Sequence, residues 1–332
     1  MGLQIGNVVP RKGIEIEDLK GKTLAVDAFN TIYQFLSTIR QPDGTPLMDK
    51  KKRITSHLSG LFYRNINLLK NGMKLVYVFD GQTPRLKGKT HEKREKNKAE
   101  AFEKYKKARD KEDVEGMGKY SKQLATLDEE KIEESKELLK ALGIAVVQAP
   151  GEGEAQASLL AQQKDVYAIA SQDYDSLLFG APKLIQNLTL SRKRKTFSGY
   201  VNIGPELIEL EKVLNSLQIN LDQLICLGIL SGTDYNPGGV KGIGPKKALD
   251  LVKKKKAPAL IFKDFELEFD WQEVFSLFKK PDVKNVEIKF PKINEEKVKE
   301  ILLEHDFSEE RVDSGLKKLE EAREKAKQRT LF

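Results

Sequence analysis

Four short apolar runs, each leading into one or two acidic residues, constrain the fold of this 332-residue chain more than any other feature. Each run is rich in strand-favouring residues and has the length of a buried β-strand. The runs and their acids are residues 23–26 with Asp27, 74–79 with Asp80, 145–147 with Glu152 and Glu154, and 166–170 with Asp173 and Asp175. Helical spacing follows at 30–36, and we expect another helix over about 155–163. The alternation of strand, acid and helix predicts an α/β fold.

The position of the acids predicts where a ligand would bind. In open α/β sheets, ligands bind in the crevice outside the carboxyl ends of the strands, where six acids from four strand ends would meet. We expect an extended backbone at residues 152–154 and 173–175, in which side chains two apart project to the same side. Gathered carboxylates repel one another unless cations neutralise them, and hard ions such as Mg²⁺ or Mn²⁺ suit such a cluster. Taken singly, each acid has the alternative of a helix-capping, turn or solvated-loop residue.

Composition and charge narrow the class of protein. Charged residues make up 33% of the chain and hydrophobic residues 39%, with no apolar stretch of transmembrane length and no signal peptide, which predicts a soluble, intracellular protein. The single cysteine, Cys226, lies in an apolar run and is expected to be a buried thiol. The net charge of +8 around an acidic pocket suits a polyanion held through its phosphates. Composition alone leaves open a basic surface that serves solubility.

Residues 83–134 differ from the rest of the chain in their long charged helix formers, which include Lys87 and Arg94. We predict an insertion of two helical halves, divided by a loop near residues 113–118, that stands out from the sheet. The alternative is a solvated helical pair without a ligand. Residues 191–196, which we expect to form a loop or hairpin tip, and residues 253–256 are two further basic clusters that solvation alone could explain.

A second phosphate-binding feature is predicted after an apolar helix at residues 221–230. Gly242 and Gly244 allow a tight turn, Pro245 suits the first helical position, and Lys246 and Lys247 follow. The free amides at this helix start can hold a phosphate without reading a base. The segment has neither the Lys-Ser/Thr of a Walker loop nor the third glycine of a dinucleotide fingerprint. A structural turn would explain the glycines but not the paired lysines.

Nine motifs lie along nearly the whole chain, at residues 1–2, 26–28, 33–36, 55–58, 62–64, 77–81, 149–155, 171–175 and 242–247. With them the chain resembles the structure-specific 5′ flap endonucleases of replication and repair, in the XPG-like nuclease family, and especially their archaeal members. The resemblance implies a PIN-like nuclease fold: a mixed, mostly parallel sheet flanked by helices. It also implies that the insertion forms a helical arch over the site and that the second feature is a helix-hairpin-helix element that grips duplex DNA.

The resemblance further implies a role for each matching residue. The metal ligands would be Asp27, Asp80, Glu152, Glu154, Asp173, Asp175 and Asp234. Two Mg²⁺ ions would bind there, with Mn²⁺ able to substitute, and K⁺ would bind at the hairpin. Lys87 and Arg94 would act in catalysis at the base of the arch, and Tyr33 would stack on a base beside the scissile phosphate. The remaining DNA contacts would be Thr55, Gly242, Gly244, Lys246 and Lys247.

The implied partners are DNA with a 5′ flap and a sliding clamp (PCNA). The implied location is the cytoplasm or nucleoid of an archaeal cell, or the nucleus if the protein is eukaryotic. The clamp would bind the tail through Gln328, Leu331 and Phe332, although this sequence stops where family tails continue to an aromatic pair, as a truncated tail would. We expect one nuclease domain, with an N-terminal region (1–82), the arch (83–134), an internal region (135–220), the hairpin element (221–258), a C-terminal helical region (259–327, with a helix over 312–327) and the tail (328–332).

Hydrolysis by two metal ions is the mechanism that these residues predict. On this scheme Asp80, Glu152 and Glu154 hold one ion, Asp173 and Asp175 hold the other, and Asp27 and Asp234 contribute directly or through water. Two alternatives of other classes are a catalytically inactive DNA-junction binding protein and a small-molecule phosphatase. A binding protein has no reason to gather acids where DNA must approach, and a small substrate needs neither arch nor hairpin.

Overall fold

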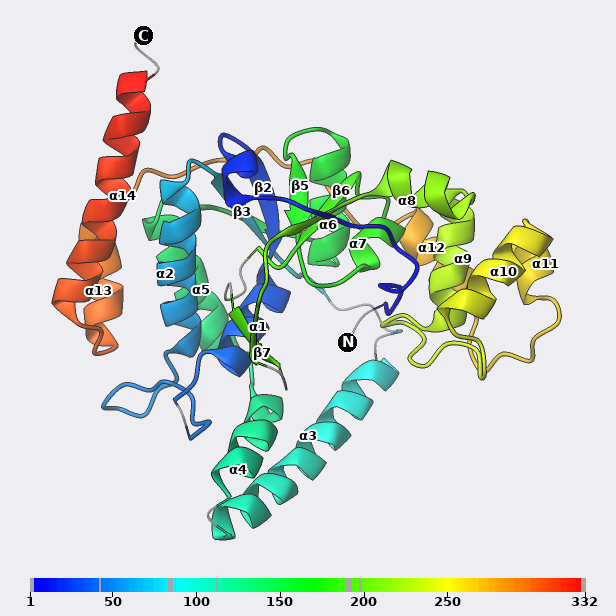
Figure 1. Cartoon of the computed structure of the whole chain (residues 1–332), viewed down its shortest axis with the longest axis horizontal. Coiled ribbons are helices and arrows are strands. Elements are labelled where there is room, and N and C mark those ends of the chain that lie inside the picture. The colour runs from blue at the N-terminus through cyan, green and yellow to red at the C-terminus, as the bar shows by residue number, and fades with distance from the viewer. Residues whose placement is uncertain are drawn as a thin grey trace.

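A seven-stranded sheet forms the centre of the computed structural model, which describes residues 3–41, 43–82, 86, 88–111, 113–188, 193–196 and 199–329 (Figure 1). In order across the sheet, the strands are β1 (Lys12–Gly13), β9 (Glu206–Glu209), β6 (Lys183–Gln186), β5 (Ala168–Ala170), β2 (Thr23–Asp27), β3 (Lys74–Phe79) and β4 (Ala145–Gln148). The five strands from β6 to β4 are parallel to one another. β9 is antiparallel to β6, and β1 is antiparallel to β9. This confirms the predicted mixed, mostly parallel sheet.

The central strands are apolar throughout because both faces of the sheet are covered. In β2, Leu24 and Val26 pack into one core while Ala25 packs into the other, and all three are fully buried. β5 is shorter than the predicted run of residues 166–170, because the amide of Val166 donates to Leu160 O at the end of the preceding helix. The alternation of side chains between the two faces fixes the register of the strands.

Helices cover each face of the sheet (Figure 1). One core includes side chains of α1 (Ala28–Thr38), α2 (Ser56–Lys70), α5 (Glu129–Ala141), α13 (Glu295–Glu304) and α14 (Glu309–Arg329). The other includes side chains of α6 (Gly153–Gln162), α7 (Asp175–Leu178), α8 (Leu210–Leu217), α9 (Leu221–Ser231), α10 (Pro245–Lys255), α11 (Pro258–Phe262) and α12 (Trp271–Lys279). In the described part of the chain no single helix is long and apolar enough to span a membrane; α8 and α9 meet that test only as a pair bent by 82°.

Helices α3 (Gly88–Asp110) and α4 (Val114–Ser121) extend together away from the body (Figure 1). The break between them is shorter than predicted: Asp113 caps α4 by accepting from the amide of Gly116 at 2.9 Å, so most of the expected loop at 113–118 is helical. The boundary we placed at residue 134 falls inside α5, whose Leu138 and Leu139 are fully buried. An amphipathic helix that packs on the body belongs to the body, so the projecting part ends before α5.

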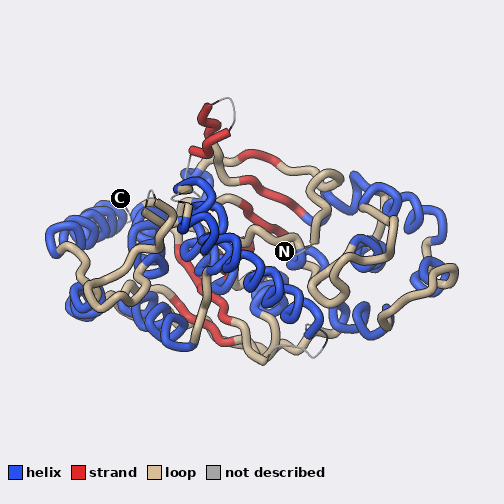
Figure 2. Tube along the Cα trace, turned by 90° about the horizontal axis from the view of Figure 1, so that it is seen from below, coloured by secondary structure: helices blue, strands red, loops and turns tan. Residues whose placement is uncertain are grey.

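The basic segment at residues 191–196 was expected to be a loop or hairpin tip. Its described part forms a strand instead, β7 (Lys193–Thr196), which pairs antiparallel with β8 (Gly199–Asn202). Residues 191 and 192 lie outside the described residues. Figure 2 shows this two-stranded ribbon standing apart from the main sheet. Residues 192–195 are four consecutive basic residues without the alternation of apolar and polar side chains that predicts a strand, which is why the pattern did not predict β7.

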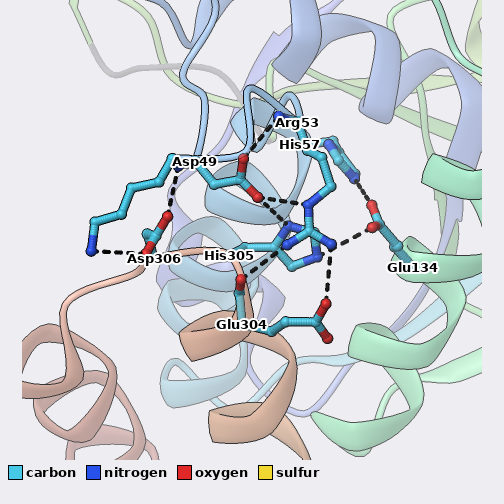
Figure 3. A network of polar contacts seen from close by, with 8 residues as sticks. Asp49, Arg53, His57, Glu134, Glu304, His305 and Asp306 are labelled. Carbon is cyan, nitrogen blue, oxygen red and sulfur yellow. Dashed lines mark hydrogen bonds and ion pairs between the residues drawn. The ribbon is translucent and has the colours of Figure 1, made fainter.

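A polar network joins the C-terminal helices to the body (Figure 3). Glu134 in α5 lies between two histidines: its Oε2 is 3.1 Å from His57 Nε2 and its Oε1 is 3.2 Å from His305 Nε2. Arg53 donates to Asp49 at 2.6 Å and to the carbonyl of Glu304 at 3.0 Å. Burial lowers the pKa of His57. Burial alone would raise the pKa of Glu134, but hydrogen bonds from the two histidines outweigh it and lower this pKa to about 2.

Both shifts make the stability of the fold depend on pH in the same direction. A depressed folded-state pKa means that the unfolded chain binds more protons, so stability is lost as pH falls. For His57 the loss begins below its unfolded pKa of about 6.5, and for Glu134 it runs from about 4.3 down to its folded pKa. We expect Glu134→Gln to cost about 2 kcal/mol at pH 7 and to flatten the loss below pH 5.

Guanidinium unfolding at pH 7 and pH 4 checks this prediction. Glu133→Gln is the matched control, because Glu133 is on the same helix, is 60% exposed and pairs only with Lys136 among the ion pairs of the described residues. We expect the control to change the unfolding free energy by less than about 0.5 kcal/mol. Equal pH dependence in the two variants would contradict the role of Glu134.

Candidate active site

Asp27 is the last residue of β2 and begins the cluster of acids. Its Oδ1 accepts from the amide of Asn30 at 3.0 Å, which caps α1, and its Oδ2 accepts from Ser171 Oγ at 3.2 Å. Only 6% of Asp27 is exposed. Burial and the neighbouring charges of Asp80 and Asp173 raise the pKa of Asp27 to about 7, against the lowering effect of those two hydrogen bonds. Carboxylates from three adjacent strand ends therefore repel one another here.

Asp80 follows β3 and reaches across to the start of α6. Its Oδ1 accepts from the amide of Gly153 at 2.7 Å. A Cβ added to residue 153 would lie 2.7 Å from the same oxygen, so this close approach requires glycine. The contact places Asp80 beside Glu152 and Glu154, which flank Gly153 in sequence.

We predicted extended backbone for Glu152 and Glu154, and the structure shows it for Glu152 (φ −79°, ψ 135°) but not for Glu154. Glu152 is the N-cap of α6 and Glu154 lies in its first turn. The free amides and the dipole of a helix N-terminus stabilise acidic side chains. The helix therefore begins at Gly153, earlier in the chain than the predicted start near residue 155. Glu154 Oε1 accepts from Ser171 Oγ at 3.4 Å, and Ser171 thus connects Glu154 to Asp27.

Asp173 and Asp175 follow shortly after β5, which ends at Ala170. Asp173 Oδ1 accepts from the amide of Tyr174 at 3.0 Å, and its own amide donates to Ser171 Oγ at 3.1 Å. Asp175 is the first residue of α7, so the extended backbone predicted here is wrong at Asp175. Asp175 is 6% exposed, and its Oδ1 accepts from the amide of Leu3 at 3.1 Å.

Tyr235 is a polar residue of the site that the sequence did not reveal. Its Oη donates to Glu152 Oε2 at 2.6 Å. Burial and the charge of Glu152 raise the pKa of Tyr235, with smaller effects from Asp175 and Glu154, so the phenol stays protonated. The acids that follow β4 and those that follow β5 therefore both lie near Tyr235. The sequence offered one signal, the adjacency of Tyr235 to Asp234, and a single tyrosine in a loop predicts nothing by itself.

The chemistry of these donors fits a hard divalent cation. They are carboxylate oxygens, which Mg²⁺ and Mn²⁺ prefer, and their repulsion is what a cation would relieve. No three acids, histidines or cysteines within the described ranges already have the arrangement of a metal-binding group. The residues that would hold an ion are therefore identified by their chemistry and their shared place at the carboxyl edge of the sheet.

Tyr33 lies on α1, and 44% of its surface is exposed. A side chain that stacks on a base needs such exposure. Thr55 precedes α2 and is only 5% exposed, so its burial does not favour a DNA contact. Lys87 lies outside the described residues. Arg94 is in α3, but its side chain is not among those described.

The predicted helix, turn and second helix are present as α9, residues 232–244 and α10. Gly242 has a φ of 79°, a conformation that favours glycine, and Gly244 and Pro245 occupy the N-cap and first position of α10. Lys246 and Lys247 are exposed on its first turn, and Lys247 Nζ donates to the carbonyl of Gly242 at 3.2 Å. In the tail, Gln328 lies in the last turn of α14 without a described side chain, and Leu331 and Phe332 lie outside the described residues.

Cavity size does not identify this site. A cavity of about 790 Å³ lies near the amino end of β3, where Met73, Lys74, Gly143 and Phe290 line it, and none of the predicted site residues does. A cavity of about 500 Å³ does include Asp173, together with Asn30 and Gln172. The concentration of charge, rather than volume, distinguishes the carboxyl edge of the sheet.

Comparison with known proteins places this geometry in a family. The XPG N-terminal domain matches residues 4–101 and the XPG I-region matches residues 143–234. Flap endonuclease 1 of Pyrococcus abyssi is 54% identical, over 100% of this chain and 97% of that protein. The structure of flap endonuclease-1 from Methanococcus jannaschii is 44% identical with a TM-score of 0.76, over 97% of this chain and 98% of that one.

A more distant structure, the catalytic core of Rad2 in complex with DNA substrate, shares the fold at 24% identity and a TM-score of 0.70, covering 95% of this chain and 97% of that one. The alignments with the curated relatives cover nearly the full length of both chains, and about half of the aligned residues are identical. The chain belongs to the flap endonuclease 1 family.

Proposed function

We propose that this chain is a structure-specific 5′ flap endonuclease that also has 5′-3′ exonuclease activity. It hydrolyses a phosphodiester near the junction of single strand and duplex, in the maturation of Okazaki fragments and in DNA repair. The observation that carries the proposal is the gathering of Asp27, Asp80 and Asp173 at adjacent strand ends, where their charges and burial raise the pKa of Asp27 to about 7. A protein with a net charge of +8 that concentrates acids at one point is suited to metal-assisted chemistry on a polyanion.

Two Mg²⁺ ions would be shared among the acids. Asp80, Glu152 and Glu154 would hold one ion, Asp173 and Asp175 would hold the other, and Asp27 and Asp234 would contribute directly or through water. When bound, Mg²⁺ supplies an activated water and Lewis-acid stabilisation of the charge that builds on the phosphate during in-line attack. Mn²⁺ has similar ligand preferences and can replace it.

The chain's own cations and aromatic surface position the DNA. Lys87 and Arg94 offer positive charge to the scissile phosphate, and Tyr33 stacks on the adjacent base. The amides at the start of α10, with Lys246 and Lys247, hold the duplex backbone without reading its sequence. From the family resemblance we further propose that K⁺ would bind at the same hairpin. The tail from Gln328 to Phe332 would contact a sliding clamp.

The test is an assay of the purified chain with Mg²⁺ on three labelled substrates: a 5′ flap, a plain duplex and a nucleotide monophosphate. We expect cleavage of the flap near its junction, slow loss of nucleotides from the 5′ end of the duplex, and no release of phosphate from the monophosphate. EDTA in place of Mg²⁺ is the control, which should stop all cleavage. Flap binding without cleavage would support an inactive junction binder, and release of phosphate would support a phosphatase.

A further inference from the structure

Tyr235 connects the hairpin element to the acidic cluster through one hydrogen bond. Its Oη donates at 2.6 Å to Oε2 of Glu152, a residue 83 positions away in the chain. Only 6% of Tyr235 is exposed, and its ring packs edge-on against Phe278 with the centroids 5.2 Å apart. Hydrogen bonds to a carboxylate are stronger than those between neutral groups. Packing therefore holds the ring, and the hydroxyl in turn holds the carboxylate of Glu152 in one direction.

The turn that carries Tyr235 is itself fixed by buried polar contacts. Asn236 Oδ1 accepts from the amide of Thr233 at 3.2 Å and from its hydroxyl at 2.7 Å. Asn236 Nδ2 donates to the carbonyl of Ile229 in α9 at 2.7 Å, and Thr233 Oγ1 accepts from the amide of Tyr235 at 3.2 Å. Thr233 and Asn236 are 3% and 4% exposed. The backbone of Tyr235 is thus anchored to the last turns of α9.

The rest of the hairpin is built on the same anchor. The amide of Val240 donates to the carbonyl of Leu230 at 2.9 Å. Gly239 has a φ of 61°, and a Cβ there would lie 2.3 Å from the same carbonyl, so the hairpin folds back directly onto α9. Gly242 and the start of α10 follow within a few residues. One rigid segment therefore presents both the proposed phosphate site of the hairpin and the hydroxyl that contacts Glu152.

We infer that Tyr235 is a positioning residue that keeps Glu152 in the orientation required to bind its metal ion. The inference rests on the function proposed above, because it assumes that Glu152 is a metal ligand. Hydrogen-bond partners that orient metal ligands typically change metal affinity or activity by about 10- to 100-fold when they are removed. Tyr235 belongs to the hairpin element and orients Glu152 through its hydroxyl. The geometry of the proposed metal site therefore depends on the same element that is proposed to bind the duplex.

Tyr235→Phe removes the hydroxyl and keeps the ring that packs on Phe278. We expect Mn²⁺ binding to the DNA-free chain, followed by calorimetry, to weaken about tenfold. The Mg²⁺ concentration for half-maximal single-turnover flap cleavage should rise by a similar factor. Flap affinity in Ca²⁺ should stay within about twofold, because Tyr235 is buried and its hydroxyl donates to Glu152.

Tyr77→Phe is the matched control. Tyr77 is also buried, and its hydroxyl donates to Asn65 Oδ1 at 2.8 Å, within the core on the face of the sheet opposite to that of Tyr235. This variant should lower stability and leave both metal dependences unchanged. If Tyr235→Phe gives the wild-type metal curves, or if it matches Tyr77→Phe in losing stability alone, the positioning role is wrong. A wild-type chain that binds no Mn²⁺ and cleaves no flap would refute the proposed function itself, and the inference with it.

Discussion

Replacement of Asp80 by alanine is expected to abolish flap cleavage while flap binding stays as tight as in the wild type or becomes tighter. Asp80 lies near both Asp27 and Glu152. Its charge raises the pKa of Asp27, and its Oδ1 accepts from the amide of Gly153, the residue next to Glu152. Loss of one carboxylate from this centre should lower the single-turnover rate by about a thousandfold or more, or about 4 kcal/mol of transition-state stabilisation. Binding should not weaken, because the removed charge repels phosphate.

Two further variants sharpen this experiment. Asp80→Asn keeps an oxygen that can accept from Gly153, so a matching loss of cleavage in this variant shows that the charge matters rather than the local fold. Asp282→Ala is the control, because Asp282 is an exposed acid beside Gly151 that belongs to none of the strand ends. It should cleave at close to the wild-type rate. Cleavage by Asp80→Ala near the wild-type rate in Mg²⁺ would remove Asp80 from the site.

The second large effect is expected for Lys87→Ala. Lys87 directly precedes α3, which begins at Gly88, and Arg94 lies seven positions further along, about two helical turns. A cation that contacts the scissile phosphate stabilises the charge that develops in the transition state more than that of the bound substrate. The loss should resemble that of an oxyanion-hole donor, about 2 to 4 kcal/mol.

Single-turnover cleavage by Lys87→Ala should therefore fall about a hundredfold or more, with flap affinity changed only a few-fold. Lys104→Ala is the matched control: Lys104 is an exposed lysine further along the same helix. This control should remain close to the wild type in both rate and affinity. If the loss in Lys87→Ala appears entirely in affinity, α3 is a basic helix that attracts DNA and has no part in the chemistry.

The fold was predictable from the sequence where burial alone decides structure. β2 ends at Asp27 and β3 ends just before Asp80, where the apolar runs predicted them, because strands covered on both faces consist of unbroken apolar residues. Pro245 at the first position of α10 was predictable for a similarly local reason, its fixed φ and missing amide hydrogen. The parallel order of the central strands then brings their carboxyl ends to one edge.

Local patterns failed where a residue suits two structures or where its partner is distant in sequence. Glu152 and Glu154 suit both a loop and a helix start, and the helix start prevailed. The hydrogen bond from Tyr235 to Glu152 spans 83 residues, and that between His57 and Glu134 spans 77. No periodicity records such contacts, because they depend on how the elements pack and not on what each element is.

We propose that acids from four strand ends and the hairpin form one site for two metal ions. The most direct measurement is the number of Mn²⁺ ions bound per DNA-free chain, obtained by titration with electron paramagnetic resonance of the free ion. We predict two ions that Mg²⁺ displaces from the wild type, and at most one under the same conditions in Asp80→Ala. No saturable Mn²⁺ binding in the wild type, or two ions bound equally well by both proteins, would contradict the claim.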